Sequence, residues 1–279
     1  MFAAASLVAK NDVASGVIVG REPEIRRLRG AIQRRESQLI WGRSHSGKTF
    51  LIRRVIAALP DADRRKCVCW TGPATGRQLV SHFIRELYLA GDTLVRRKIH
   101  ADRAGEFTLD RWINDQTLSR LRSILYSAAE HGDYCFFVDH LPSPTHHMAH
   151  LLKDLMYRCK TPVYFTGTGY SREAIGYAWS LYWADEYRIE LQPLTEAPAR
   201  QLLESCIRNF GLSGLDLERF REEILRFSGR LPGSIVKMCE LAADPRYHYG
   251  DRVKVKLVHV EYLLRGGRFS ALNSRNHPS

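Results

Sequence analysis

An eight-residue glycine-rich segment constrains this chain more than any other feature. Residues 42–49 read GRSHSGKT, which matches the phosphate-loop pattern GxxxxGK[ST]. In that pattern the glycines let the backbone wrap so that successive N–H groups point at phosphate oxygens. A predicted strand at 38–41 precedes the segment and a predicted helix at 48–59 follows it, which is the context that such a loop requires. The residues predicted to bind nucleotide phosphates are Gly42, Arg43, Ser44, His45, Ser46, Gly47, Lys48 and Thr49.

Two residues of this loop and one distant carboxylate have specific expected roles. The helix that starts at Lys48 adds its positive N-terminal end, and the Lys48 ammonium reaches the β- and γ-phosphates of ATP. Thr49 supplies a hydroxyl to Mg²⁺, which also needs a carboxylate from a neighbouring strand. Asp139 ends the apolar run 135–138 and is predicted to hold Mg²⁺ together with Thr49. In an alternative interpretation, Asp139 only caps a turn.

The composition is that of a folded protein. The chain has 279 residues, of which 44% are hydrophobic and 26% charged, and this excludes a wholly disordered chain. No apolar run approaches the ~20 residues of a transmembrane helix, and no basic residue precedes the apolar stretch 2–9, which is a poor signal peptide. The six scattered cysteines fit reduced core thiols. We therefore predict a cytoplasmic protein without membrane contact.

The charge balance favours polyanionic partners. Lys and Arg number 42 against 30 for Asp and Glu, a formal net charge of +12. Arg252, Lys254 and Lys256 alternate as they would on one face of a strand. No zinc-finger or helix-turn-helix signature accompanies the basic clusters, so we predict non-specific, salt-dependent contacts to the phosphates of duplex DNA. Taken singly, each basic cluster is typical of a solvated surface.

Apolar strands alternate with helices up to about residue 194. The predicted strands cover residues 38–41, 67–70, 135–139, 162–166 and 187–191. A first helix is predicted to begin at residue 22. Further helices are predicted over 48–59, 76–90, 109–131 and 148–159. This alternation predicts an α/β fold, a P-loop NTPase αβα sandwich with a parallel sheet. From residue 195 onward only helices are predicted, over 197–210, 215–228 and 232–243. The predicted division is an N-terminal tail (1–16), a P-loop ATPase core (17–194), a small helical lid (195–265) and a C-terminal tail (266–279).

With these motifs placed, residues 17–243 resemble the AAA+ and STAND ATPases, which include initiator-like, archaeal-type and transposon-associated ATPases. Residues 19–24, VGREPE, are similar to the VGRExE segment that lies beside the adenine in that family. Residues 163–168 resemble the strand that carries sensor 1, and residues 228–232, SGRLP, resemble the GxP-type lid motif. The resemblance implies nucleotide contacts for Val19, Gly20, Arg21, Arg230 and Pro232, and a γ-phosphate sensor at Thr168.

Two departures from the family bear on hydrolysis. The family places Glu directly after the metal-binding Asp to polarise the attacking water, whereas this chain has His140. A neutral imidazole can accept a proton, but it has a different reach. The family also supplies an arginine finger just before the last core strand, where this chain has Leu181, and Arg172 and Arg188 are the flanking candidates. We therefore predict ATP binding with slow or partner-dependent hydrolysis to ADP.

Two further groups contain residue types that commonly bind metals. His146 and His150 are spaced i,i+4 and can share a helix face, and Cys67 and Cys69 lie on one side of a predicted strand. Neither group has the additional Cys or acidic ligands of a known metal motif. Surface histidines and core thiols are therefore the favoured interpretations.

Together these observations predict an ATP-dependent switch or assembly factor of AAA+ type. We expect it to associate with duplex DNA and to act as a homo-oligomer or with a protein partner. An alternative is a STAND-like signalling switch that binds a protein partner and no nucleic acid. In a third interpretation, the chain is a degenerate P-loop subunit with only a structural role.

Overall fold

The computed structural model describes residues 19–72, 75–101, 108–140, 145–169 and 171–266. These residues form two compact units, each described here by itself. The first unit comprises residues 23–42 and 48–190, and the second comprises 19–22, 43–47 and 191–266. The second unit therefore includes the tip of the phosphate loop, which the sequence placed wholly in the core. The predicted N-terminal tail, 1–16, and residues 267–279 of the predicted C-terminal tail lie outside the described residues.

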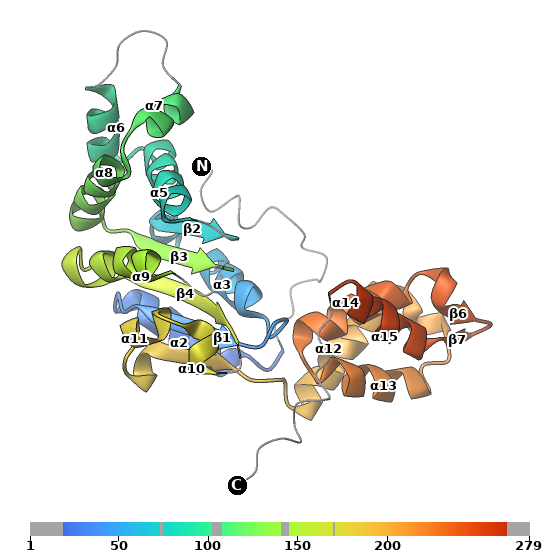
Figure 1. Cartoon of the computed structure of the whole chain (residues 1–279). Helices are drawn as coiled ribbons and strands as arrows, with labels where there is room; N and C mark the ends of the chain where they lie inside the picture. Colours follow the sequence, from blue (N-terminus) through green and yellow to red (C-terminus); the bar gives the residue numbers. More distant parts are fainter. Residues whose placement is uncertain (1–18, 73–74, 102–107, 141–144, 170, 267–279) are drawn as a thin grey trace. The chain divides into compact units, whose positions relative to one another are not determined.

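A five-stranded sheet forms the centre of the first unit (Figure 1). The strands are β1 (Gln38–Gly42), β2 (Cys67–Thr71), β3 (Cys135–Asp139), β4 (Val163–Thr168) and β5 (Arg188–Leu191), in the spatial order β2-β3-β4-β1-β5. The pairs β1/β4, β2/β3 and β3/β4 are parallel. Because parallel strands end at the same edge, Gly42, Asp139 and Thr168 all lie at the carboxyl edge of the sheet. The predicted parallel αβα fold is confirmed.

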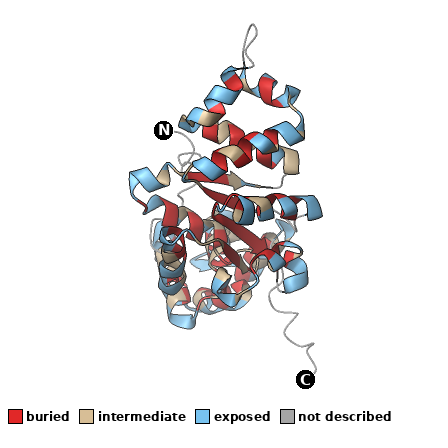
Figure 2. Cartoon of the chain, turned by 90° about the vertical axis from the view of Figure 1, so that its left-hand side faces the viewer, coloured by how far each residue is buried: buried red, intermediate tan, exposed pale blue. Residues whose placement is uncertain are grey.

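The sheet forms because its strands are continuous apolar runs that helices cover. All five residues of β3 are buried, and so are the first five of β4. The rings of Phe137 and Tyr164 stack with centroids 4.5 Å apart. Figure 2 shows these strands as buried segments in the interior of the unit. This burial on both faces is what a run without polar alternation predicts.

Ten α-helices of the described residues surround or extend this sheet. They are α2 (Glu22–Gln33), α3 (Lys48–Ala57), α4 (Asp61–Arg64), α5 (Gly76–Ala90), α6 (Thr93–His100), α7 (Leu109–Asp115), α8 (Leu118–His131), α9 (His146–Lys153), α10 (Arg172–Ile175) and α11 (Ala178–Leu181). Figure 1 shows α5 to α8 gathered beyond the β2 edge. Across the described part of the chain, no helix has both the length and the apolar character needed to cross a bilayer.

The predicted helix at 109–131 is two helices, which is a correction. Chain direction changes between α7 and α8 at Gln116, whose backbone is extended with φ −80° and ψ 148°. Thr117 then caps α8, because its hydroxyl accepts a hydrogen bond from the backbone N–H of Arg120 at 3.3 Å. Helix α6, which the sequence analysis did not predict, begins in the same way with Asp92 as its cap.

The second unit is mainly helical around its own apolar core. Its elements are α12 (Glu196–Asn209), α13 (Glu218–Ser228), α14 (Pro232–Ala242), the antiparallel hairpin β6 (His248–Tyr249) and β7 (Arg252–Val253), and α15 (Val255–Leu264). Fully buried residues such as Ile224, Ile235 and Met238 make up the core. Pro232 opens α14 at a position where its missing N–H costs no helical hydrogen bond.

The expectation that residues 252–256 form a single strand is wrong. Strand β7 ends at Val253, and α15 starts at Val255. The reason is apolar spacing, because Val255, Val258 and Tyr262 are buried at the i, i+3 and i+7 positions of one helix face. Arg252, Lys254 and Lys256 nevertheless line one surface pocket.

Candidate nucleotide-binding site

The phosphate loop begins at the end of β1 and leads into α3. Gly42 and Gly47 have φ values of 148° and 95°, which a side chain would strain. Lys48 is the first residue of α3, with only 5% of its surface exposed, and its ammonium donates a hydrogen bond to the carbonyl of Gly42 at 3.0 Å. Burial lowers the pKa of Lys48 to about 8, and the negative charge of Asp139 opposes part of that shift. The ammonium is therefore held at the loop with its charge poorly solvated.

The carboxylate of Asp139 has one bonded and one unbonded oxygen. The Thr166 hydroxyl donates to Asp139 Oδ1 at 2.7 Å. Asp139 Oδ2 is buried and has no hydrogen-bond partner among the described residues, and Asp139 is 2% exposed. Burying an ionised oxygen without a partner is costly unless a cation completes the site. Carboxylate and hydroxyl oxygens are the ligands that Mg²⁺ prefers, so the donor set fits that ion.

His140 lies against both of the predicted metal-binding residues. Its Nε2 is 2.9 Å from Thr49 Oγ1, within hydrogen-bonding distance, and 3.9 Å from Asp139 Oδ2. The backbone has φ 59°, a left-handed conformation in which His is enriched among non-glycine residues. The His140 N–H donates to Thr166 Oγ1 at 3.0 Å, which holds this turn in place. The structure thus brings Thr49, Asp139 and His140 together in the first unit.

Thr166 is a site residue that the sequence analysis missed. Its buried hydroxyl donates to Asp139 and accepts from the His140 N–H, so it orients the last residue of β3 and the residue that follows it. A threonine in the middle of an otherwise apolar strand was the available signal. The predicted sensor, Thr168, is exposed two residues further along β4, opposite Gly42 in the β1–β4 register. Its role as a γ-phosphate sensor stays a prediction.

The two arginine-finger candidates have different environments. The guanidinium of Arg188 donates to the carbonyls of Tyr182 and Trp183, pairs with Asp185 at 3.0 Å and stacks 4.1 Å over the Trp179 ring. These contacts give Arg188 a structural role within its own unit. Arg172 is exposed at the start of α10. Of the two, Arg172 has the side chain that is accessible to a neighbouring molecule.

The tip of the phosphate loop packs within the second unit. His45 Nδ1 lies 2.7 Å from the Tyr262 hydroxyl and 3.3 Å from that of Ser234, and the Gly233 N–H donates to the His45 carbonyl at 2.9 Å. Lys237 Nζ lies 3.4 Å from His45 Nε2. These contacts attach the loop tip to α14 and α15, and no local sequence pattern predicted them. The backbone of His45 is left-handed, with φ 66°.

The residues of the VGRExE segment also lie in the second unit. The buried Arg21 guanidinium donates to the carbonyls of Ser46 and Gln192. A side chain on Gly20 would meet Pro198 at 2.6 Å, so only glycine fits there. Val19 is buried. The predicted nucleotide contacts of Val19, Gly20 and Arg21 stay predictions.

The predicted lid residues are also placed in that unit. Arg230 is exposed, has φ 57°, and accepts a hydrogen bond from the Leu194 N–H through its carbonyl at 3.0 Å. The Pro232 ring would lie 3.5 Å from a side chain added at Gly47. The lid motif therefore packs against the loop tip at residue 47, which is part of the same unit.

The histidine and cysteine groups stay outside this site. His146 and His150 place their Nε2 atoms 3.2 Å apart, but in the described ranges no group of three or more potential ligands assembles. Cys67 and Cys69 are buried, and burial raises the pKa of both thiols well above the usual range. Neutral buried thiols fit a packing role.

Comparison with solved structures finds chains of similar fold. The Walker-type ATPase PABY2304 of Pyrococcus abyssi matches with a TM-score of 0.58 at 16% identity, over 93% of this chain and 77% of its own. Cdc6p from Pyrobaculum aerophilum matches with a TM-score of 0.51 at 13% identity, over 86% of this chain and 65% of its own. A STAND protein with a tetratricopeptide repeat sensor, PH0952 from Pyrococcus horikoshii, matches with a TM-score of 0.51 at 16% identity, over 92% of this chain and 34% of its own.

At these identities the likeness concerns the fold alone, and this chain spans only about a third of the length of the STAND protein. Sequence comparison gives no matching family model and no matching curated protein. The fold assignment combines three observations: a phosphate loop between β1 and α3, the strand order β5-β1-β4-β3-β2, and the structural matches. The chain has the fold of an AAA+/STAND-type P-loop ATPase.

Proposed function

We propose that this protein binds ATP and Mg²⁺ and works as a nucleotide-dependent switch or assembly factor. The single observation that carries the proposal is a buried ammonium and a buried carboxylate that interact at the carboxyl edge of the sheet. Lys48 is a buried cation on the phosphate loop, and Asp139 has a buried oxygen without a partner in the described residues. A phosphate group and a divalent cation are the ligands that complement these two charges.

Each residue has a defined task in this proposal. Lys48 and the loop N–H groups hold the phosphates, while Thr49 and Asp139 hold the metal. Bound Mg²⁺ would neutralise charge on the phosphate oxygens. Thr166 keeps the Asp139 carboxylate oriented through a 2.7 Å hydrogen bond. His140 stands where the family has a glutamate, and its contact with the Thr49 hydroxyl supports the proposal of slow hydrolysis.

The substitution His140→Glu is expected to raise the rate of ATP hydrolysis by roughly 100-fold, which is the lower end of what a positioned general base contributes. The change also removes the imidazole that lies 2.9 Å from the Thr49 hydroxyl, which the metal needs. The measurement is phosphate release in a single turnover with excess enzyme.

His140→Asn is the matched control for this substitution. Asparagine tolerates the left-handed backbone at this position but supplies no base, so its rate should stay near that of the unmodified protein. Equal rates in all three proteins would show that residue 140 does not limit hydrolysis.

We further propose that the protein associates with duplex DNA and assembles as a homo-oligomer or with a protein partner. The net charge of +12 supports the DNA contact. The contacts of Arg188 within its own unit support the proposal of assembly with a partner. Because Arg188 is held by these contacts, a catalytic arginine would have to be an accessible one, such as Arg172, or belong to another molecule. The alternative is a STAND-like switch without nucleic acid, which the structural match to PH0952 favours.

ATP turnover at low salt, with and without duplex DNA, tests these proposals. Lys48→Ala serves as the blank. Stimulation by DNA above that blank supports the DNA-associated switch. No stimulation, with ATP retained by the unmodified protein and lost by the variant, favours the STAND-like switch. Absence of ATP binding in the unmodified protein would leave only a structural role.

A further inference from the structure

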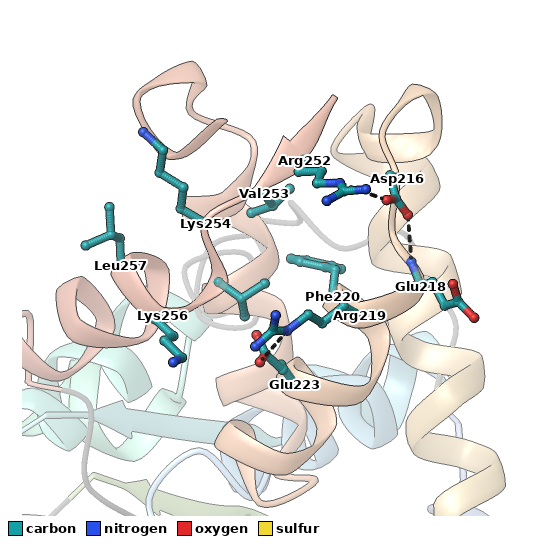
Figure 3. Close-up of a pocket in the computed structure, with 11 residues that line it drawn as sticks. Asp216, Glu218, Arg219, Phe220, Glu223, Arg252, Val253, Lys254, Lys256 and Leu257 are labelled. Atoms are coloured by element: carbon teal, nitrogen blue, oxygen red, sulfur yellow. Dashed lines mark hydrogen bonds and ion pairs between the residues drawn. The ribbon is translucent and has the colours of Figure 1, made fainter. Parts of the chain in front are cut away.

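The second unit has a surface pocket of about 560 Å³ between α13, β7 and the start of α15 (Figure 3). Its apolar floor includes the buried Phe220 and Val255. Cationic side chains project around this floor from two sides, with Arg219 on α13 and Arg252, Lys254 and Lys256 along the hairpin and α15. None of the nucleotide-site residues described above lines this pocket.

Two of the cations are paired with carboxylates: Arg252 with the exposed Asp216, and Arg219 with Glu223, whose side chain is only 11% exposed. Arg252 Nε lies 3.1 Å from Asp216 Oδ2, and Arg219 Nε lies 3.0 Å from Glu223 Oε1. The Arg252 side chain is 73% exposed, and such pairs stabilise a protein only weakly because water and salt screen them. An incoming phosphate can therefore compete for the Arg252 guanidinium, whereas Arg219 stays paired with the buried Glu223.

Lys254 and Lys256 have no acidic partner among the described residues. Figure 3 shows Lys254 where the chain leaves the hairpin and Lys256 on α15, and no dashed line joins either ammonium to a carboxylate. Lys254 Nζ lies 5.7 Å from the ring centroid of Tyr249, which is 76% exposed at the end of β6. The carboxylates that line the pocket come from the α13 side. Lys254 and Lys256 are therefore the cations of this pocket that form no ion pair within the described residues, whereas Arg252 of β7 is paired with Asp216.

We propose that the β6–β7 hairpin and the first turn of α15 bind the phosphodiester backbone of duplex DNA. This proposal rests on the proposed DNA association and names the surface that makes the contact. An arginine and an exposed tyrosine on a two-stranded ribbon, followed by two lysines without an acidic partner in the described part of the chain, are chemistry that binds a nucleic-acid backbone. The contact reads no base sequence, because the side chains are those that bind phosphate.

Helix α15 links this surface to the phosphate loop within the same unit. Its first residue, Val255, lines the pocket, and Tyr262 near its other end contacts His45 of the loop at 2.7 Å. The Tyr262 hydroxyl is also 2.8 Å from the Ser234 hydroxyl, so two groups hold it in place: the His45 imidazole and the Ser234 hydroxyl. If nucleotide binding shifted the loop tip, the His45–Tyr262 contact would transmit that shift to α15. Binding of ATP should then alter DNA affinity, and DNA should alter ATP affinity by the same factor.

The first test is a double charge reversal, Lys254→Glu with Lys256→Glu, in the full chain. We expect its affinity for a short duplex of mixed sequence to fall at least roughly tenfold at about 50 mM salt, and the slope of log affinity against log salt to flatten by about 2. Arg97→Glu with Lys98→Glu, two exposed cations on α6, is the control with the same change of charge. Fluorescence anisotropy measures all three proteins.

The outcomes separate the surface from the proposed function. Loss of affinity in the hairpin variant, with little loss in the control, supports the surface. Equal losses in both variants, or none in the hairpin variant, overturn it while the DNA association stands. No DNA binding by the unmodified protein at low salt overturns the DNA association itself. Retention of ATP by the hairpin variant shows that the variant is folded.

The second test concerns the link through α15. In Tyr262→Phe, we expect the ratio of DNA affinities with saturating ATP and without nucleotide to move toward one, because the hydroxyl contact with His45 is lost. Tyr247→Phe, an aromatic change in the same unit, is the control. An unchanged ratio in Tyr262→Phe, or a ratio of one in the unmodified protein, overturns the link but leaves the surface intact.

Discussion

Replacing Lys48 by alanine is expected to weaken ATP binding by roughly 100-fold or more, equivalent to about 2.7 kcal/mol. The reason is that the Lys48 ammonium is almost fully buried and is held at the loop by the Gly42 carbonyl at 3.0 Å. A charge-assisted contact in such a site is far stronger than the same contact in water. Isothermal titration calorimetry with a slowly hydrolysed ATP analogue measures the change.

Lys153→Ala is the matched control, because Lys153 is an exposed lysine on α9. Its ATP affinity should equal that of the unmodified protein. If Lys48→Ala retained ATP as well as this control, the phosphate loop would not bind nucleotide, and the purely structural role would be the remaining interpretation.

The pKa of Lys48 adds a pH dependence to the same experiment. Without nucleotide this pKa is lowered by burial to about 8, so the amine loses its charge as pH rises through that value. A bound triphosphate favours the charged form, so binding takes up a proton above that pH. ATP affinity should therefore fall by up to about tenfold per pH unit above pH 8. In Lys48→Ala this decline should be absent.

Replacing Asp139 by asparagine is expected to lower Mg²⁺-dependent ATP hydrolysis by roughly 100-fold or more, a loss at the scale of an essential electrostatic group. Asparagine keeps the shape and the hydrogen bond from Thr166 but removes the charge that would hold the metal. The substitution relieves the buried Asp139 Oδ2, which has no hydrogen-bond partner among the described residues, but it also removes a charge that favours the buried Lys48 ammonium. Because these two effects oppose each other, the variant should melt close to the unmodified protein. Phosphate release during a Mg²⁺ titration and a thermal melt measure the two effects.

Asp115→Asn, an exposed change on α7, is the control for Asp139→Asn. The Asp139 variant also carries an internal check, because the charge of Asp139 raises the pKa of Lys48. Removing that charge should move the alkaline decline in ATP affinity to lower pH. Full hydrolysis in Asp139→Asn would exclude this carboxylate as the metal-binding group.

Much of the fold could be predicted because its signals are local. Residues 39–41 and 135–138 are continuous apolar runs, and each lies in a strand of the sheet as predicted. Helix α5 has the predicted bounds, Gly76–Ala90, because a capping box starts it and a left-handed Gly91 ends it. The errors lie where polar caps interrupt an amphipathic pattern, as between α7 and α8, or where a short strand passes directly into a helix, as at Val255.

In the candidate site too, some residues could be predicted from the local sequence and others could not. The identity of the phosphate loop, its lysine and its threonine follows from the spacing of residues 42–49, and the position of Asp139 follows from the apolar run before it. By contrast, Thr166 meets Asp139 across 27 residues of chain, and Tyr262 meets His45 across 217. Such contacts depend on strand order and helix packing, which local patterns do not encode. The sequence by itself therefore determined which groups can bind phosphate and metal. Only the tertiary structure decided which side chains orient those groups, because hydrogen bonds of 2.7 Å form only between elements that the fold has brought side by side.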